Sequence, residues 1–313
     1  MKLISWLAAG SVAGWGAARL AGADQIRRLE APAAPLMSFT PHVTAAALLG
    51  SVVLRRRGAA TTAGLTGAAL AAVVLPRAIR RPQPQAAGPV LRVLTANLLA
   101  GRAAEEAVVG LIRQQDADVL FLQELPDAAV TRLEQAGLGD LLPYGVTDAR
   151  GGGAGGSGIY ARFPLAGGGL CLTPTRAAQP TARLELGSGR CVDLVCVHAA
   201  PPKPPSSRLK VARWREELAT LPPPADPPRV LAGDFNATAD HAQFRRLLRK
   251  GHVDAAGEMG NGLVPTWGPR GRPALLTIDH VLVDPRCAVL ATSVHDLPGS
   301  DHRAVYAEFR LPG

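Results

Sequence analysis

Aromatic residues make up only 4% of this 313-residue chain, and acidic residues are scarce in its first 85 positions. That segment holds ten basic and two acidic residues, a net charge of +8. Residues 86–313 hold 24 basic and 23 acidic residues, a net charge of +1. Proteins that bind nucleic acid need a basic surface, and many stack the bases on aromatic side chains. The main part of the chain lacks both, so nucleic acid is not favoured as its partner.

A cysteine pattern for zinc is also missing. The four cysteines are Cys171, Cys191, Cys196 and Cys287, and no two of them have the CxxC spacing of structural zinc sites. Two disulfides would fit an exported protein, and buried thiols would fit any other location. The sequence leaves this choice open.

Long stretches without charge are present near the N-terminus. Residues 3–18, 36–54 and 58–76 contain no charged side chain. About 20 apolar residues in a helix span a bilayer, so these stretches predict a membrane segment over residues 1–76 with about three transmembrane helices. A buried Ala-rich bundle and a cleavable signal peptide over the first stretch are the alternatives.

The distribution of arginine bears on orientation. Positive residues in short loops tend to remain in the cytoplasm, so the arginines at 55–57 place the rest of the chain outside the cell. The arginines within residues 77–81 argue the other way. We expect a cell-membrane protein with an extracellular catalytic domain. Residues 77–89 are rich in Pro and Arg and predict a stiff linker to a domain over 90–313.

From residue 90 onward, apolar runs typical of buried strands alternate with helical patterns and include a β meander. This order predicts an α/β fold in which two sheets pack face to face and helices cover their outer faces, a four-layer design.

Polar residues of a particular kind stand next to these apolar strands. They are Asn97, Glu124, His198, Asp234 with Asn236, Asp279 with His280, and Asp301 with His302. The ends of strands in packed sheets converge on a common rim, so six such places predict one site. Residues i and i+2 of a strand point the same way, so we expect Asp234 and Asn236 to converge on one ligand.

Each of these residues also has an ordinary interpretation. Glu124 could cap the next helix, His198 could be a packed core histidine, and Asp234 and Asn236 could form a turn. A carboxylate at the mouth of a buried strand is costly unless it is paired or binds a metal. Glu124 with the Asn97 amide suits a hard cation, Mg²⁺ or Mn²⁺. Asp279 could hold an imidazole in its cationic form.

At this point the chain resembles the endonuclease/exonuclease/phosphatase (DNase I-like) superfamily. The motifs that carry the resemblance are Thr-Ala-Asn-Leu-Leu at 95–99, Leu-Gln-Glu-Leu at 122–125, Val-His at 197–198, Gly-Asp-Phe-Asn-Ala at 233–237, Ile-Asp-His-Val at 278–281 and Ser-Asp-His-Arg-Ala-Val at 300–305. The set is specific, although no single member is. The resemblance implies a four-layer α/β/β/α sandwich with its site at one end.

The resemblance also implies roles for the residues. Glu124 and Asn97 would hold the catalytic Mg²⁺ (or Mn²⁺), with Asp301 helping to position metal or water. The implied catalytic residues are Asp234, which orients or deprotonates the attacking water, Asn236 and His198, which hold the phosphate, and His302, which stabilises the transition state and is oriented by Asp279. His280 would point away and be structural.

The function implied is that of a metal-dependent hydrolase of phosphate esters. Leu98 and Leu99 follow Asn97 where abasic-site nucleases carry an acidic residue, which weakens a DNA-repair role. The N-terminal stretches make the chain similar to membrane-anchored bacterial members, with membrane lipids as partners and a lipid-linked or extracellular phosphoester as substrate. A membrane-anchored extracellular endonuclease and a non-catalytic binding module are the alternatives.

Overall fold

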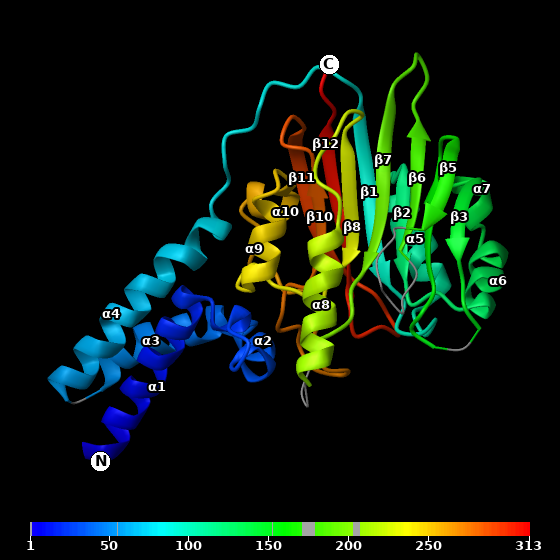
Figure 1. Ribbon diagram of the computed structural model, residues 1–313. Coiled ribbons are helices and arrows are strands. Elements are labelled where there is room, and N and C mark those ends of the chain that lie inside the picture. The colour runs from blue at the N-terminus through cyan, green and yellow to red at the C-terminus, as the bar shows by residue number, and fades with distance from the viewer. Residues whose placement is uncertain (1, 55, 152, 171–178, 203–206) are drawn as a thin grey trace.

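The computed structural model describes residues 2–54, 56–151, 153–170, 179–202 and 207–313. Its N-terminal part is helical and lies to one side of a β sandwich, as Figure 1 shows in blue and cyan. The elements of this N-terminal segment are α1 (Lys2–Ala21), the 3-10 turn η1 (Ala23–Gln25), α2 (Glu30–Met37), α3 (Thr40–Val53), α4 (Arg57–Val74) and the 3-10 turn η2 (Leu75–Ala78).

One helix in the described part of the chain, Arg57–Ala78, is long and apolar enough to cross a membrane. The predicted stretch at 36–54 is not one continuous helix, because α2 and α3 meet at a bend of 74°. Pro41 lies in the first turn of α3, a position where proline starts a helix rather than continuing one. The three predicted membrane spans stay a prediction, and Arg55, the first of the three arginines at 55–57, lies outside the described residues.

The first sheet has six strands in the order β11-β12-β1-β2-β4-β3. Its central neighbours β1 and β2 run parallel, and the other neighbours run antiparallel. The strands are β1 (Val90–Asn97), β2 (Val119–Gln123), β3 (Tyr144–Asp148), β4 (Ser157–Ala161), β11 (Ala288–Asp296) and β12 (Arg303–Arg310).

The second sheet repeats this plan in the order β5-β6-β7-β8-β10-β9. Its one parallel pair, β7 and β8, brings His198 directly opposite Asp234. The strands are β5 (Leu165–Leu170), β6 (Pro180–Glu185), β7 (Cys191–His198), β8 (Arg229–Asp234), β9 (Val253–Asp254) and β10 (Asp279–Val283).

Helices cover the outer face of each sheet, which confirms the predicted four-layer sandwich (Figure 1). Apolar side chains of both sheets fill the space between them. A second core lies between the first sheet and α5 (Glu105–Gln115), α6 (Asp127–Gln135) and α7 (Leu138–Leu141). A third lies between the second sheet and α8 (Arg208–Thr220) and α9 (Ala242–Leu248), and short α10 (Ala255–Glu258) follows β9.

The described cysteines carry free thiols: Cys196 and Cys287 are buried and Cys191 is partly exposed. Burial raises the pKa of the Cys196 thiol to about 12, so this side chain packs as a small apolar group. Cys171 lies outside the described residues.

Candidate active site

The predicted site residues gather at one rim of the sandwich. Asn97 ends β1 and Glu124 directly follows β2, while His198 and Asp234 end β7 and β8. The carboxyl ends of parallel strands in one sheet lie at the same edge, and the two central pairs face each other across the core.

Asp279 and His302 reach this rim from the start of a strand rather than from its end. Asp279 begins β10, and His302 directly precedes β12. Both strands run antiparallel to their neighbours β8 and β1, so their first residues lie beside the last residues of those neighbours. Asp279 is thus the register partner of Asp234.

Asp234 ends β8, and Asn236 lies beyond it in a tight turn with left-handed backbone (φ 47°), so the two side chains meet through the turn and not through strand alternation. The Asn236 backbone N–H donates to Asp234 Oδ1 at 2.8 Å, and Asn236 Nδ2 donates to Oδ2 at 3.1 Å and to the Ala199 carbonyl at 2.9 Å. Gly233 is required before this turn, because a Cβ there would lie 1.9 Å from the Val197 carbonyl oxygen. The close approach of β7 and β8 therefore fixes where the Asp234 carboxylate points.

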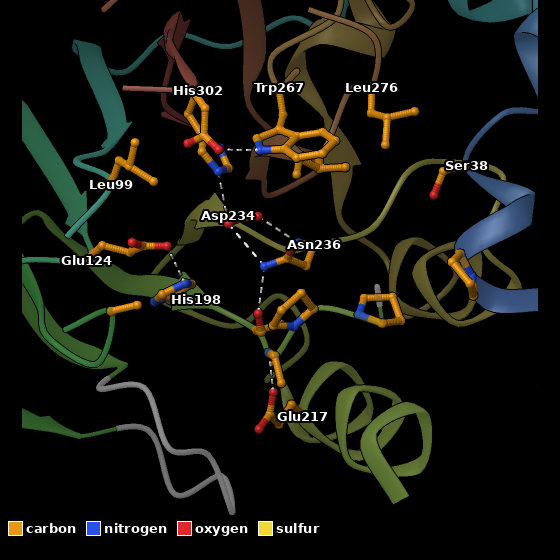
Figure 2. Close-up of a pocket in the computed structure, with 18 of the residues that line it drawn as sticks. Ser38, Leu99, Glu124, His198, Glu217, Asp234, Asn236, Trp267, Leu276 and His302 are labelled. Atoms are coloured by element: carbon orange, nitrogen blue, oxygen red, sulfur yellow. Dashed lines mark hydrogen bonds and ion pairs between the residues drawn. The ribbon is translucent and has the colours of Figure 1, made fainter. Parts of the chain in front are cut away.

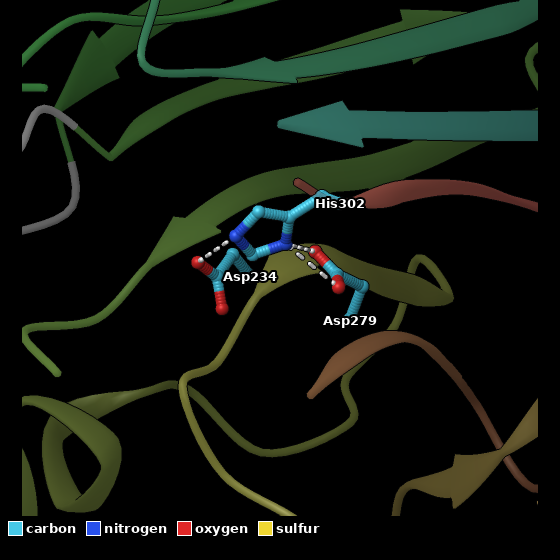
Figure 3. Close-up of side chains that lie close together, drawn as sticks. All are labelled: Asp234, Asp279 and His302. Atoms are coloured by element: carbon cyan, nitrogen blue, oxygen red, sulfur yellow. Dashed lines mark hydrogen bonds and ion pairs between the residues drawn. The ribbon is translucent and has the colours of Figure 1, made fainter. Parts of the chain in front are cut away.

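His302 lies between two carboxylates, as Figure 3 shows. Its Nδ1 contacts the Asp279 carboxylate at 3.0 and 3.1 Å, and its Nε2 is 3.8 Å from Asp234 Oδ2. Asp279 is held in turn by the Thr266 hydroxyl, which donates to it at 2.7 Å. Burial disfavours the imidazolium, but Asp279 and Asp234 outweigh it and raise the pKa of His302 to about 10. The ring is a cation at neutral pH.

For the pKa of Asp234, burial outweighs the effect of the neighbouring positive charge. Burial is the largest influence and raises the pKa of the Asp234 carboxyl to about 7, even though the positive charge of His302 lowers it. Asn97, which is fully buried, donates from Nδ2 to Asp234 Oδ2 at 3.2 Å. A carboxylate with a pKa near neutrality is suited to taking a proton from water.

Glu124 occupies the other side of the same rim. Its backbone is left-handed (φ 55°), and its carboxylate accepts from the Ala100 N–H at 2.8 Å and from Asn97 Nδ2 at 3.4 Å. His198 Nε2 lies 3.9 Å from Glu124 Oε1. Burial, with a smaller effect of His302, lowers the pKa of His198 to about 4, so this imidazole is neutral.

The donor set fits a divalent cation. The Glu124 carboxylate oxygens and the Asn97 amide oxygen, which accepts from the Leu99 N–H at 3.0 Å and keeps a second lone pair, are hard ligands that suit Mg²⁺. Asp301 Oδ1 is buried and has no hydrogen-bond partner among the described residues, so it offers a further oxygen. Asp234, Asp279 and His302 also have ligand atoms within 4.8 Å of one another. Carboxylates lie next to both ring nitrogens of His302, so we interpret Asp234, Asp279 and His302 as an ion-paired triad. We assign the cation to the oxygen atoms of Glu124, Asn97 and Asp301.

His280 faces away from the rim, as the family resemblance implies. Its Nδ1 contacts Asp254 Oδ2 at 3.0 Å, and its Nε2 contacts the Ala237 carbonyl at 2.9 Å. The ring packs against Phe235 and Phe244 in the core under α9. Its role is structural.

The rim opens into a cavity of about 690 Å³. Figure 2 shows Glu124, His198, Asp234 and His302 on one side of it and Ser38 and Leu276 on the other. Two residues of this region were not found from the sequence. Trp267 lines the cavity and donates from Nε1 to Asp301 Oδ2 at 3.1 Å, and Thr266 supports Asp279. Both lie in a loop whose sequence has no helical or strand periodicity. The one feature that could have pointed to them is a tryptophan next to a threonine between Pro265 and Gly268.

Two packed mixed sheets with carboxylate, amide and imidazole groups at one rim define the class of DNase I-like α/β sandwiches. The chain belongs to the endonuclease/exonuclease/phosphatase family, whose sequence model matches residues 94–302. Proteins of this family are typically metal-dependent phosphoester hydrolases. No curated protein sequence matches the chain.

Several solved structures share the fold at low identity. An endonuclease/exonuclease/phosphatase protein from Beutenbergia cavernae is 20% identical, with a TM-score of 0.57 over 72% of each chain. A humanized D. rerio TDP2 is 19% identical, with a TM-score of 0.56 over 71% of this chain and 99% of that one. The 3′ phosphatase NExo from Neisseria, bound to product DNA hairpin, is 21% identical, with a TM-score of 0.54 over 70% of this chain and 99% of that one.

Proposed function

We propose that the protein is a membrane-anchored, Mg²⁺-dependent (or Mn²⁺-dependent) hydrolase of phosphate esters. The observation that carries this proposal is the triad in which His302 lies between Asp279 and Asp234 at the base of the cavity. A cation and a carboxylate with a pKa near 7, side by side, suit a reaction in which water loses a proton while negative charge grows on phosphate.

Each side chain has one task in this reaction. Asp234 orients the attacking water and takes its proton. Asn236 and neutral His198 hold the phosphate oxygens by hydrogen bonds, Asn236 through the amide that now donates to Asp234 and Ala199. His302, kept cationic by Asp279, stabilises the charge of the transition state.

Glu124, Asn97 and Asp301 would hold the cation. When bound, it neutralises phosphate charge and polarises the ester. The chain prepares these ligands itself, because the backbone N–H of Ala100 and the amide of Asn97 fix the Glu124 carboxylate.

The membrane setting makes a lipid-linked or extracellular phosphoester the proposed substrate. A helix long enough to cross a bilayer precedes the sandwich, and several apolar side chains line the cavity. The proposed location is the cell membrane, with the catalytic domain outside the cell. An extended basic groove for nucleic acid has no support in the near-neutral charge of residues 86–313.

The test uses the full chain in lipid nanodiscs with a panel of lipid pyrophosphates, phospholipids and plasmid DNA. We expect release of phosphate or alcohol with Mg²⁺, and its loss with EDTA. Asp234→Asn and His302→Ala should each lose at least about a thousandfold in kcat while the domain remains folded. Asp140→Asn, an exposed carboxylate on α7, is the matched control.

Three outcomes would count against the proposal. No metal-dependent hydrolysis of any ester would support a binding module. Plasmid nicking without lipid hydrolysis would support the endonuclease. Wild-type rates in Asp234→Asn would remove the assignment of the base.

A further inference from the structure

One wall of the catalytic cavity comes from outside the sandwich. Pro35, Leu36, Ser38 and Phe39 line the cavity together with Glu124, Asp234 and His302 of the rim. They belong to the bend between α2 and α3, which we name the elbow (residues 35–39). Figure 2 shows Ser38 on this wall, across the cavity from Glu124.

The elbow is apolar where it meets the cavity. Leu36 is 46% exposed and Phe39 is 37% exposed. Leu276 and Ile278 continue the apolar lining on the side of the sandwich. A cavity of about 690 Å³ is the size that holds a whole small ligand. A phosphate at the rim fills a small part of it, so the remaining apolar space is available to another part of the same substrate.

The elbow packs against the layer of α8 and α9 that covers the second sheet. Ala34 beside it is fully buried among side chains of α8 and β8, and its carbonyl contacts His241 Nε2 at 2.7 Å. Ser38 Oγ lies 3.4 Å from the same His241 nitrogen. His241 is only five residues beyond Asn236, so the elbow and the catalytic turn share one support.

A buried ion pair fastens the rest of the N-terminal segment at the same place. Arg19 of α1 and Arg77 after α4 both bind the Asp240 carboxylate, at 2.8 and 2.7 Å. We name these three residues the buried clamp. Asp24 of η1 also accepts from the Ala242 backbone N–H at 2.7 Å. The helices that would sit in the membrane are thus joined to the loop that leaves the active site.

The same helices expose apolar side chains away from the sandwich. The most exposed on α3 and α4 are Leu48, Leu49, Val52, Val53 and Leu65. Exposed apolar side chains in such number mark a membrane or protein contact. The elbow therefore connects an apolar helical surface with the catalytic rim.

We infer that the elbow binds the hydrocarbon chain of an amphiphilic phosphoester and so selects long-chain esters over soluble ones. The inference rests on the proposed hydrolase function. The phosphate of the substrate lies at the rim, and its chain lies along Leu36 and Phe39 toward the membrane helices. Each buried methylene adds to the binding of the chain, whereas a short ester gains nothing from this wall.

The test compares the wild type with Leu36→Ala/Phe39→Ala, both as full chains in nanodiscs. The substrates are methyl and dodecyl phosphate and methyl and dodecyl p-nitrophenyl phosphate, so each pair differs only in chain length. We expect the double variant to lose about tenfold in kcat/KM on the dodecyl esters through KM. Its kcat/KM on the methyl esters stays within about twofold.

Leu49→Ala/Val53→Ala is the control, because it removes similar apolar area from α3 outside the cavity. This control should leave kcat/KM on the dodecyl esters and kcat/KM on the methyl esters at their wild-type values. Equal losses on dodecyl and methyl esters, or no loss on either, would overturn the inference while leaving the hydrolase function intact. If the double variant does not fold, Phe39→Ala alone makes the same comparison with a loss of about threefold.

A binding measurement separates this inference from the proposed function. Dodecylphosphonate, which has no ester to cleave, is titrated into both proteins by calorimetry below its micelle concentration, with methylphosphonate as reference. Tenfold weaker binding of the dodecyl compound to the double variant supports the elbow site even if no ester is hydrolysed. Equal binding to both proteins overturns it.

Discussion

Replacing Asp240 with alanine is expected to release the N-terminal segment from the sandwich. The Asp240 side chain is fully buried and accepts hydrogen bonds from Arg19 Nε at 2.8 Å and from two Arg77 nitrogens at 2.7 Å. Its removal leaves two guanidinium groups buried without an anion, which costs about 3–5 kcal/mol. Because 1.4 kcal/mol is about tenfold, the detached state should become roughly two to four orders of magnitude more populated.

Amide hydrogen exchange measures this detachment directly. The Ala242 N–H donates to Asp24 Oδ2 across the contact, so its exchange reports whether the N-terminal segment is in place. We expect at least a hundredfold loss of protection in Asp240→Ala at pH 7. Arg81→Ala is the control, because its ion pair with Glu258 leaves 54% of the Arg81 side chain exposed and is worth at most about 1 kcal/mol.

A change in Ala242 protection of less than fivefold in Asp240→Ala would refute this reasoning. The pH dependence gives a second check. Burial raises the pKa of Asp240, but Arg77 and Arg19 outweigh burial and hold it below the usual value of 3.8. A carboxyl group whose pKa is lowered in the folded state stabilises that state at pH values above its unfolded pKa. This stabilisation is lost as the pH falls through the folded pKa. Wild-type protection should therefore persist down to about pH 4 and decrease below it.

Three further predictions concern the sandwich. Thr266→Val should lower kcat about 10–100-fold and the free energy of unfolding by about 1–3 kcal/mol, because it removes the hydroxyl that holds Asp279, and Thr266→Ser should restore both quantities. His280→Ala should cost about 2–4 kcal/mol of stability in chemical unfolding at pH 6. Burial lowers the pKa of His280, but Asp254 raises it by more, so the net pKa is raised. The stabilisation by the His280–Asp254 pair is therefore complete below about pH 6.5 and is lost as the pH rises through the raised pKa. A cost of the substitution that grows from pH 6 to pH 9 would contradict this. Gly233→Ala should abolish cooperative thermal unfolding, and a wild-type melting temperature would show that the backbone contact at this position is not required.

The sequence predicts the sandwich and the composition of its rim because each polar residue interrupts an apolar run. Where the run stops, the strand reaches the edge of the sheet, so Asn97, His198 and Asp234 could be placed without coordinates. Asp279 and His302 were assigned to the same rim, and the motif that contains His302 directly precedes the last strand. An antiparallel neighbour delivers its first residue to the edge where a parallel strand delivers its last.

The cavity wall could not be predicted in this way. The elbow meets the rim through tertiary packing between segments about 200 residues apart, and no local pattern records such a contact. Residues 36–54 contain no charge, and this hid the break between α2 and α3. Pro35 and Pro41 were the available signal, since proline inside a helix interrupts its hydrogen bonds.

The turn between β6 and β7 has a practical consequence. Gly187 and Gly189 give it left-handed backbone, and its residues 187–190 are exposed. β7 carries the chain from this turn over eight residues to His198, about 26 Å at the rise of a strand. Figure 1 shows the turn at the end of the sandwich opposite the rim. A protease recognition sequence inserted there would be cut in intact cells only if the sandwich faces the medium, and the catalytic groups would remain undisturbed.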